Sequence, residues 1–318
     1  MRRERGVALL TVLLLVAVMT AIAVGMLDDI RFGLRRAANA QGMAQAQWYA
    51  LGAETLARAQ IERLGRRDGQ RTTLTGDWND RPLAFPIEGG LIRARVRDAT
   101  ACFNLNSVVE GAGEMLRRRD QGVRQFLALL AALEVEPRRA QALADALVDW
   151  IDSDARPEPF GAEDTAYAAR GYLPGNTLLA EPSELRALEG MDAALYARLR
   201  RHVCALPTTA LSPVNVNTLG EDDALILVML TEGALGVEEA RAVLARRPRD
   251  GWRDFASFWS LPQLAALPVL DQVSLRSRYF ALHAEVEVMD AEAVLTALFE
   301  HDAGGRVRLL ARRWTPDE

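Results

Sequence analysis

The sequence has few of the residues and motifs that most enzymes need. Its histidines are few and scattered, at His202, His283 and His301. It contains no H-E-x-x-H metal-binding helix, no G-x-S-x-G nucleophile elbow and no Walker-type glycine loop. It also lacks an excess of positive charge, because the formal net charge is -5, and this argues against a nucleic-acid binder. The sequence therefore predicts a protein that is not an enzyme.

A long segment without charged residues, from Val7 to Leu27, follows a short basic stretch at the start of the chain. An α-helix rises 1.5 Å per residue, so about 21 residues span a hydrocarbon core of roughly 30 Å. Arg2, Arg3 and Arg5 precede the segment, and positive charge on one side of a span keeps that side in the cytoplasm. The sequence thus predicts a single-pass inner-membrane protein with a cytoplasmic N-terminus and a periplasmic C-terminal domain.

Two interpretations of this segment compete. A cleaved secretory signal would have its small-x-small cleavage site at Ala21-Ile22-Ala23 and a mature chain starting at Val24. A retained helix is favoured by apolar residues that continue at helical spacing, at Ile30, Leu34, Ala37, Ala38, Trp48, Leu51, Leu56, Ile61 and Leu64. We therefore predict one transmembrane and stalk helix over 7–64, about 85 Å long.

Alternating patterns near both ends of the remaining chain predict a small antiparallel sheet. In the segment 65–105, Gly89-Gly90 separates two short strand-like runs, and apolar residues alternate with arginines in LIRARVRD. In the segment 278–318, LHAEVEV alternates in the same way, and RVRLLARR follows the turn at Gly304-Gly305. Such strands have one buried face and one solvated face.

The chain between these two segments reads as helical, because alanine, leucine and arginine dominate it. Two similar sequences, FNLNSVVE and VNVNTLGE, have capping-box spacing at Ser107 and Glu110 and at Thr218 and Glu221. Their similarity predicts two related helical units, 106–205 and 206–277. The predicted fold class is α+β: a long N-terminal helix and a small antiparallel sheet interrupted by a large helical insertion.

Two stretches of the insertion, LEGMDAALYARLRRHV and LTEGALGVEEARAVLARR, resemble helix-hairpin-helix or SAM-like units. Helix-hairpin-helix modules often bind the DNA backbone through a Gly-hydrophobic-Gly hairpin. The third hairpin position is occupied by Asp192 in the first stretch and by Glu238 in the second. A carboxylate at this position repels phosphate. We therefore interpret both stretches as structural, with no nucleic acid bound. A membrane-anchored or secreted periplasmic module that binds DNA is the alternative function.

One loop concentrates acidic residues. Asp149, Asp152 and Asp154 lie close together, and Glu163 and Asp164 follow after prolines and a glycine. Calcium takes six to eight oxygen ligands, which carboxylates on an irregular loop can supply, although the spacing is not that of an EF-hand. A glycosidase acid pair is disfavoured because no aromatic cluster accompanies it. The spacing of these residues alone favours neither a calcium site nor a solvated acidic loop.

The chain has two cysteines, Cys102 and Cys204, at the two ends of the first predicted helical unit. An even number of cysteines in an oxidising compartment is typical of disulfide-bonded proteins. The pair predicts a disulfide that ties the helical insertion to the sheet. Two buried free thiols are the alternative.

The N-terminus resembles the leader of type IV prepilins and type II secretion pseudopilins, which prepilin peptidase cuts after a glycine. By that resemblance residues 1–6 are the leader, and the cut between Gly6 and Val7 makes Val7 the methylated N-terminus. Most members carry glutamate at the fifth mature position, where this chain has Thr11. That glutamate would neutralise the terminal ammonium of a neighbour inside an apolar bundle. A subunit without it fits the filament tip.

The missing glutamate, the large size and the helical insertion are similar to the minor pseudopilin K family of the type II secretion system. The resemblance implies calcium in the acidic loop, where D-W-x-D-x-D and G-A-E motifs match residues 149–154 and 161–163. It implies a tip complex with I- and J-type minor pseudopilins and contact with the major pseudopilin. The implied function is to cap the pseudopilus, initiate its assembly and support export of folded proteins, with secreted substrate or the outer-membrane channel as further contacts.

Overall fold

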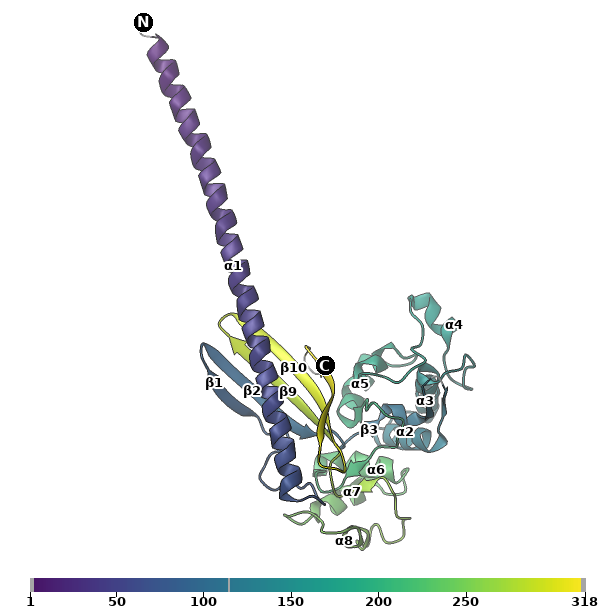
Figure 1. Cartoon of the computed structure of the whole chain (residues 1–318). Helices are drawn as coiled ribbons and strands as arrows, with labels where there is room; N and C mark the ends of the chain where they lie inside the picture. The colour runs from purple at the N-terminus through teal and green to yellow at the C-terminus, as the bar shows by residue number, and fades with distance from the viewer. Residues whose placement is uncertain (1–2, 114, 316–318) are drawn as a thin grey trace.

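The structure is a computed structural model that describes residues 3–113 and 115–315. One helix, α1 (Arg3–Arg67), runs for 65 residues. Its most apolar stretch has a mean hydropathy of 2.7 and is not buried, so α1 is long and apolar enough to cross a membrane. Figure 1 shows α1 extending far beyond the globular part. The predicted long apolar helix is confirmed.

An antiparallel sheet of five strands packs against the C-terminal part of α1 (Figure 1). In spatial order the strands are β1 (Leu83–Ile87), β2 (Gly90–Asp98), β9 (Tyr279–Val288), β10 (Ala291–His301) and β11 (Val307–Arg313). β2 pairs with β9, with Ile92 opposite Val286, so segments far apart in the sequence lie side by side. The antiparallel sheet and the α+β class are therefore confirmed.

Small side chains let α1 lie close to the sheet. The buried helix residues recur every three or four positions, at Ala46, Ala50, Ala53, Ala57 and Ile61. They share one core with sheet residues such as Ile92 and Phe280. Because side chains of a strand alternate between faces, Arg93, Arg95 and Arg97 of β2 lie on the face opposite α1.

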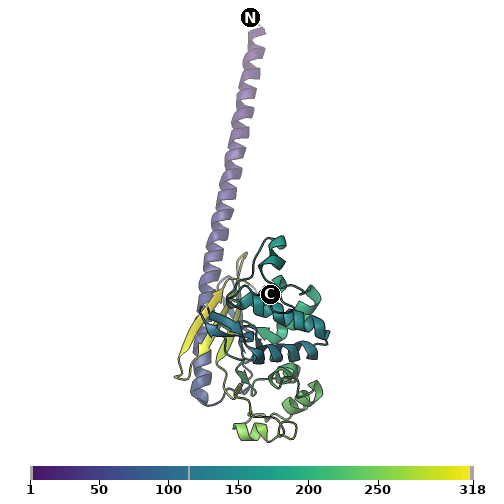
Figure 2. The ribbon, with the colours of Figure 1, turned by 90° about the vertical axis from the view of Figure 1, so that its right-hand side faces the viewer.

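The region between β2 and β9 contains mainly short helices as its regular structure and lies beside the sheet (Figures 1 and 2). Its α-helices are α2 (Asp120–Ala132), α3 (Pro137–Ile151), α4 (Asp164–Tyr167), α5 (Ala193–Leu199), α6 (Ala224–Leu230), α7 (Val237–Ala245) and α8 (Phe255–Trp259). Its 3-10 turns are η1 (Leu105–Val108), η2 (Ala168–Arg170), η3 (Pro182–Ala187), η4 (Arg200–His202) and η5 (Glu221–Asp223). Its short strands are β3 (Phe103–Asn104), β4 (Val109–Ala112), β5 (Met115–Arg118), β6 (Val203–Cys204), β7 (Val214–Asn215) and β8 (Val273–Ser274).

The prediction that this whole region is helical is wrong at the hairpin of β4 and β5. The two strands pair antiparallel, with Glu110 opposite Arg117. Gly111 has a φ of 117°, and a Cβ there would lie 1.9 Å from the carbonyl oxygen of Met115. Only glycine fits so close to a neighbouring strand, so the chain folds back instead of continuing as a helix.

The predicted capping boxes are also wrong. Ser107 Oγ and Thr218 Oγ1 donate hydrogen bonds to carbonyl oxygens three residues earlier, at 2.6 and 2.9 Å. Glu110 lies in β4 and pairs with Arg117, and Glu221 starts a single 3-10 turn. A capping box needs an α-helix at this point of the chain, whereas here each hydroxyl closes a short buried turn.

The two N-x-N sequences form matching turns. Asn104 lies in a parallel pair of short strands, β3 and β6, and Asn215 lies in an equivalent pair, β7 and β8. The second asparagine of the first motif, Asn106, bonds both the N–H and the carbonyl of Leu179, at 2.8 and 3.0 Å. Asn217 bonds the same two groups of Trp252, at 2.7 and 3.1 Å. Both helical units are thus built on one hydrogen-bond pattern.

The two hairpin carboxylates predicted to repel DNA are engaged within the protein. Asp192 caps α5 by accepting from the N–H of Leu195, and it pairs with Arg139 at 2.6 Å. Glu238 pairs with Arg241 on α7. These contacts stabilise the starts of two short helices. The assignment of the stretches as helix-hairpin-helix units stays a prediction.

Asp98 joins the sheet to the helical region. It ends β2 and is buried, and its carboxylate accepts from Thr100, Thr218 and Ser277, with side-chain oxygen distances of 2.6, 2.5 and 2.6 Å. Burial raises the pKa of Asp98, while the three hydroxyls favour its charged form. Because Thr100 and Ser277 lie at the two ends of the insertion and Thr218 begins its second unit, Asp98 fixes its attachment to the sheet.

Candidate functional sites

The N-terminal half of α1 is an exposed apolar surface. Its large apolar side chains from Leu9 to Leu34 are exposed, which suits a membrane or a bundle of partner helices. Thr11 lies on this exposed part, and Gly6 and Val7 belong to the same helix. The structure describes the backbone of Gly6 and Val7 and not their surroundings, so the cleavage site stays a prediction.

Beyond the apolar segment, α1 has an exposed side with little charge. The sequence contains no charged residue from Ala37 to Ala53. Trp48 is 74% exposed and Leu56 is 57% exposed. Leu56 also lines an apolar groove of about 380 Å³ between α1 and the edge strand β1. A tryptophan this exposed, on a helix that further along also borders an apolar groove, indicates a surface that contacts another protein.

The acidic loop, residues 152–163, connects α3 to α4. Asp149 lies on α3 beneath the loop, is fully buried, and accepts the N–H of Glu158 at 3.0 and 3.3 Å. A Cβ at Gly161 would lie 1.8 Å from Asp149 Oδ2, so only glycine lets the loop fold onto this carboxylate. Burial raises the pKa of Asp149 to about 6. Asp149 therefore holds the loop against α3.

Asp152 and Glu163 are buried carboxylates with unsatisfied oxygens. In the described part of the chain, Asp152 Oδ1 and both carboxylate oxygens of Glu163 have no hydrogen-bond partner. Burial, followed by the charges of neighbouring acids, raises the pKa of Asp152 and of Glu163 to about 7. A buried carboxylate without a donor is destabilising, and a bound cation would offset this repulsion. Hard oxygen donors are those that calcium prefers.

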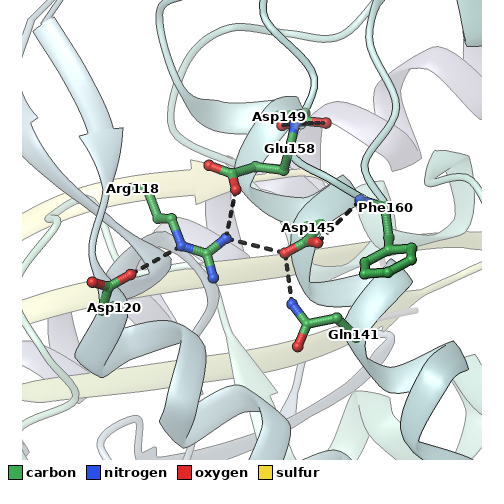
Figure 3. Close-up of polar contacts among 7 residues, drawn as sticks. All are labelled: Arg118, Asp120, Gln141, Asp145, Asp149, Glu158 and Phe160. Atoms are coloured by element: carbon green, nitrogen blue, oxygen red, sulfur yellow. Dashed lines mark hydrogen bonds and ion pairs between the residues drawn. The ribbon is translucent and has the colours of Figure 1, made fainter.

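A network around Arg118 of β5 positions the loop (Figure 3). Its guanidinium contacts Asp120, Asp145 and Glu158 at 3.0, 3.0 and 3.1 Å. Asp145 is buried on α3 and also accepts from Gln141 at 2.8 Å. Because Glu158 belongs to the acidic loop, Arg118 ties that loop to the hairpin and to α3. These residues lie too far apart in the sequence for their spacing to indicate the network.

The five predicted calcium ligands have different surroundings. Asp154 accepts the N–H of Arg156 at 2.8 Å, and Asp164 begins α4. Among the described residues, no group of three or more Asp, Glu, His or Cys side chains is already placed to hold a metal ion. The residues therefore fit calcium by donor type and by the uncompensated charge of Asp152 and Glu163, and calcium binding stays a prediction.

The two cysteines, Cys102 and Cys204, form a disulfide with their Cα atoms 5.8 Å apart. β3 and β6 pair in parallel at this point, with Asn104 opposite Cys204. The bond links the start of the first helical unit to its end. Leu206, two residues after Cys204, donates its N–H to Asn104 Oδ1 at 3.0 Å, so a hydrogen bond reinforces the same closure.

Two family models match the helical region. Both describe protein K of the type II secretion system, one over residues 101–208 and the other over residues 214–276. These ranges correspond to the two units that share the asparagine turns.

Relatives of known name match nearly the whole chain. A type II secretion system protein K of Aeromonas hydrophila is 38% identical over 322 residues, covering 98% of this chain and 97% of the relative. The same protein of Klebsiella pneumoniae is 42% identical over 285 residues, covering 89% and 86%. The crystal structure of the GspK-GspI-GspJ complex of enterotoxigenic Escherichia coli contains a chain with a TM-score of 0.77 and 33% identity, covering 88% of this chain and 99% of that one.

Proposed function

The chain belongs to the type II secretion system protein K family, and we propose that this minor pseudopilin caps the tip of the pseudopilus and initiates its assembly. The observation that carries the proposal is the similarity to the GspK-GspI-GspJ complex, combined with the exposed face of α1 around Trp48. Contact with the major pseudopilin below the tip follows from that position. A subunit at the tip would also face the secreted substrate or the outer-membrane channel.

Two features of the chain support a place at the tip. The helical region widens the globular part on one side of the sheet (Figure 2), and such a bulk does not fit between regularly stacked subunits. Thr11 stands where a pseudopilin in the shaft would offer a carboxylate to the terminal ammonium of its neighbour. A subunit without this carboxylate leaves a neighbouring ammonium unpaired in an apolar bundle, which is costly. At the tip no neighbour needs that partner.

We predict that the exposed face of α1 binds the I- and J-type pseudopilins. Trp48→Ala is expected to weaken the ternary complex by about 2 kcal/mol, roughly 30-fold in Kd, because buried tryptophans dominate such interfaces. The measurement is the affinity of the full chain in detergent for the I and J pseudopilins of the same organism. Met115, 80% exposed on the β4–β5 hairpin, provides the control Met115→Ala, which leaves the Kd within about 2-fold. Equal Kd values for both variants would reject this surface.

Processing gives a second test. In cells that contain prepilin peptidase, the mature chain is expected to begin at N-methyl-valine 7, and in cells without the peptidase it keeps Met1. Mass spectrometry of the N-terminal peptide measures both states, and Gly6→Val is expected to block the cut. A chain beginning at Val24 would show that the apolar segment is a secretory signal.

We propose that the acidic loop binds calcium through Asp152 and Glu163, with Asp154 and Asp164 as neighbouring donors. Asp149 has both of its oxygens engaged with the backbone N–H of Glu158, so its main part is to hold the loop on α3. Bound calcium would supply positive charge where burial and repulsion now raise two carboxyl pKa values. The loop would then be rigid at the surface of the tip.

A further inference from the structure

A groove rich in arginine lies between the sheet and the first helical unit. Its volume is about 460 Å³, and five arginines line it: Arg95, Arg97, Arg200, Arg201 and Arg313. Of the described residues that line it, two are acidic, Asp80 and Glu181. We name this surface the arginine groove. Neither the helix α1 nor the acidic loop contributes to it.

The fold brings these arginines together from distant parts of the chain. Arg95 and Arg97 lie on the face of β2 opposite α1, and Arg313 ends β11 on the same sheet. Arg200 and Arg201 follow α5 in the turn η4, directly before the strand that carries Cys204. The disulfide fixes this wall of the groove against β3. The positive charges are thus held in place by a sheet on one side and by a crosslinked turn on the other.

The positive charge of the groove is only partly neutralised. Arg95 lies 3.7 Å from Asp80, and Arg313 pairs with Glu181 at 2.5 Å. Within the described residues, Arg200 and Arg201 are exposed and form no ion pair. Arg200 and Arg201 therefore leave positive charge without a described acidic partner in this concave site. Concave walls of low dielectric concentrate such a field and attract an anionic partner.

The apolar part of the groove indicates what kind of anion fits. Ala281, Leu298 and Ala311 lie between the arginines and are small or apolar, so they offer contact to carbon atoms of a ligand. A lipid headgroup is an unsuitable occupant, because α1 rises about 22 Å between Leu27 and Gly42 and holds the sheet that far from the apolar segment. Guanidinium groups bind carboxylates in a bidentate manner. We propose that the arginine groove binds an acidic, extended polypeptide segment of another protein.

The proposal goes beyond tip assembly and is tested without the I and J partners. The probe is a fluorescein-labelled peptide of four Asp-Ala repeats, titrated with the full chain in detergent and followed by fluorescence anisotropy. The double variant R200E/R201E is expected to weaken binding at least 10-fold. The control R138E/R249E changes the same charge at exposed arginines outside the groove and is expected to stay within 2-fold. Circular dichroism confirms that both variants are folded.

Three results would overturn the proposal. The first is equal binding by the two double variants, which would show non-specific attraction to positive charge. The second is competition by inorganic phosphate as effective as that of unlabelled peptide at the same charge concentration, which would show a simple anion site. The third is binding of anionic phosphatidylglycerol vesicles that R200E/R201E abolishes while peptide binding persists. The Trp48→Ala variant is expected to bind the peptide normally, so failure of the groove and failure of the I and J interface are distinguishable.

Discussion

Replacing Cys102 and Cys204 by serine is expected to lower the free energy of unfolding by about 3–5 kcal/mol. The two residues are separated by 102 positions, and closing a loop of that length restricts the unfolded chain strongly. In the chain-entropy account, a loop of this size is worth about 4–5 kcal/mol when the native geometry is unstrained. The loss should fall on the whole helical region, because both units share one hydrophobic core.

Urea denaturation of the full chain in detergent, with and without a reducing agent, measures this effect. Reduction of the unmodified protein should reproduce the double variant, and reducing agent should leave the double variant unchanged. Each single serine variant should behave like the double variant, because either one removes the bond. A loss below about 1 kcal/mol would mean that the hydrogen bond from Leu206 to Asn104 and the β3–β6 pairing already close the unit without the disulfide.

Local periodicity was enough to predict the sheet and the long helix. In β2 the arginines at 93, 95 and 97 alternate with residues that pack toward α1, and alternation is a local signal that reports which face is buried. The uncharged segment of α1 could be predicted in the same way, because its length matches the thickness of a membrane's hydrocarbon core. Both features depend on residues that are neighbours in the sequence.

The asparagine turns could not be predicted from local spacing. The sequence around Ser107 has the spacing of a capping box, but the decisive bonds of Asn106 go to Leu179 and Leu206, which are 73 and 100 positions away. A buried amide takes the partners that the tertiary fold supplies, and these override a local preference. The similarity of the two motifs reflects the same turn used twice, and the relation between the two helical units stays a prediction.

The acidic loop was likewise predictable only in part from the sequence. Its carboxylates were apparent from the sequence, whereas the residues that position them were not. Arg118 is 27 positions from Asp145 and 40 from Glu158, so no spacing rule connects them. The structural role of Gly161 could have been predicted, since a glycine in a loop often marks a place where the backbone approaches another group closely. Here that group is the carboxylate of Asp149.

Calcium is expected to stabilise the protein through the acidic loop by about 2.7 kcal/mol, if calcium is present at 100 times its Kd and binds only the folded chain. The variant D152N/E163Q is expected to lose this response. Without calcium, the same variant is expected to be more stable than the unmodified chain, because it removes two buried carboxylates whose unpartnered oxygens repel neighbouring acids. The two proteins should therefore exchange their order of stability when calcium is added.

Thermal unfolding in EGTA and in excess calcium measures this exchange of order. The control D250N/E88Q removes the same charge at two exposed positions and should keep the full calcium response. If D152N/E163Q still gained stability from calcium, the ion would bind elsewhere. If the unmodified chain gained none, the loop would be a solvated acidic surface. A gain in the control and not in the double variant would instead assign the site to Asp152 and Glu163, because in the described part of the chain only those two carboxylates combine burial with oxygens that lack a donor.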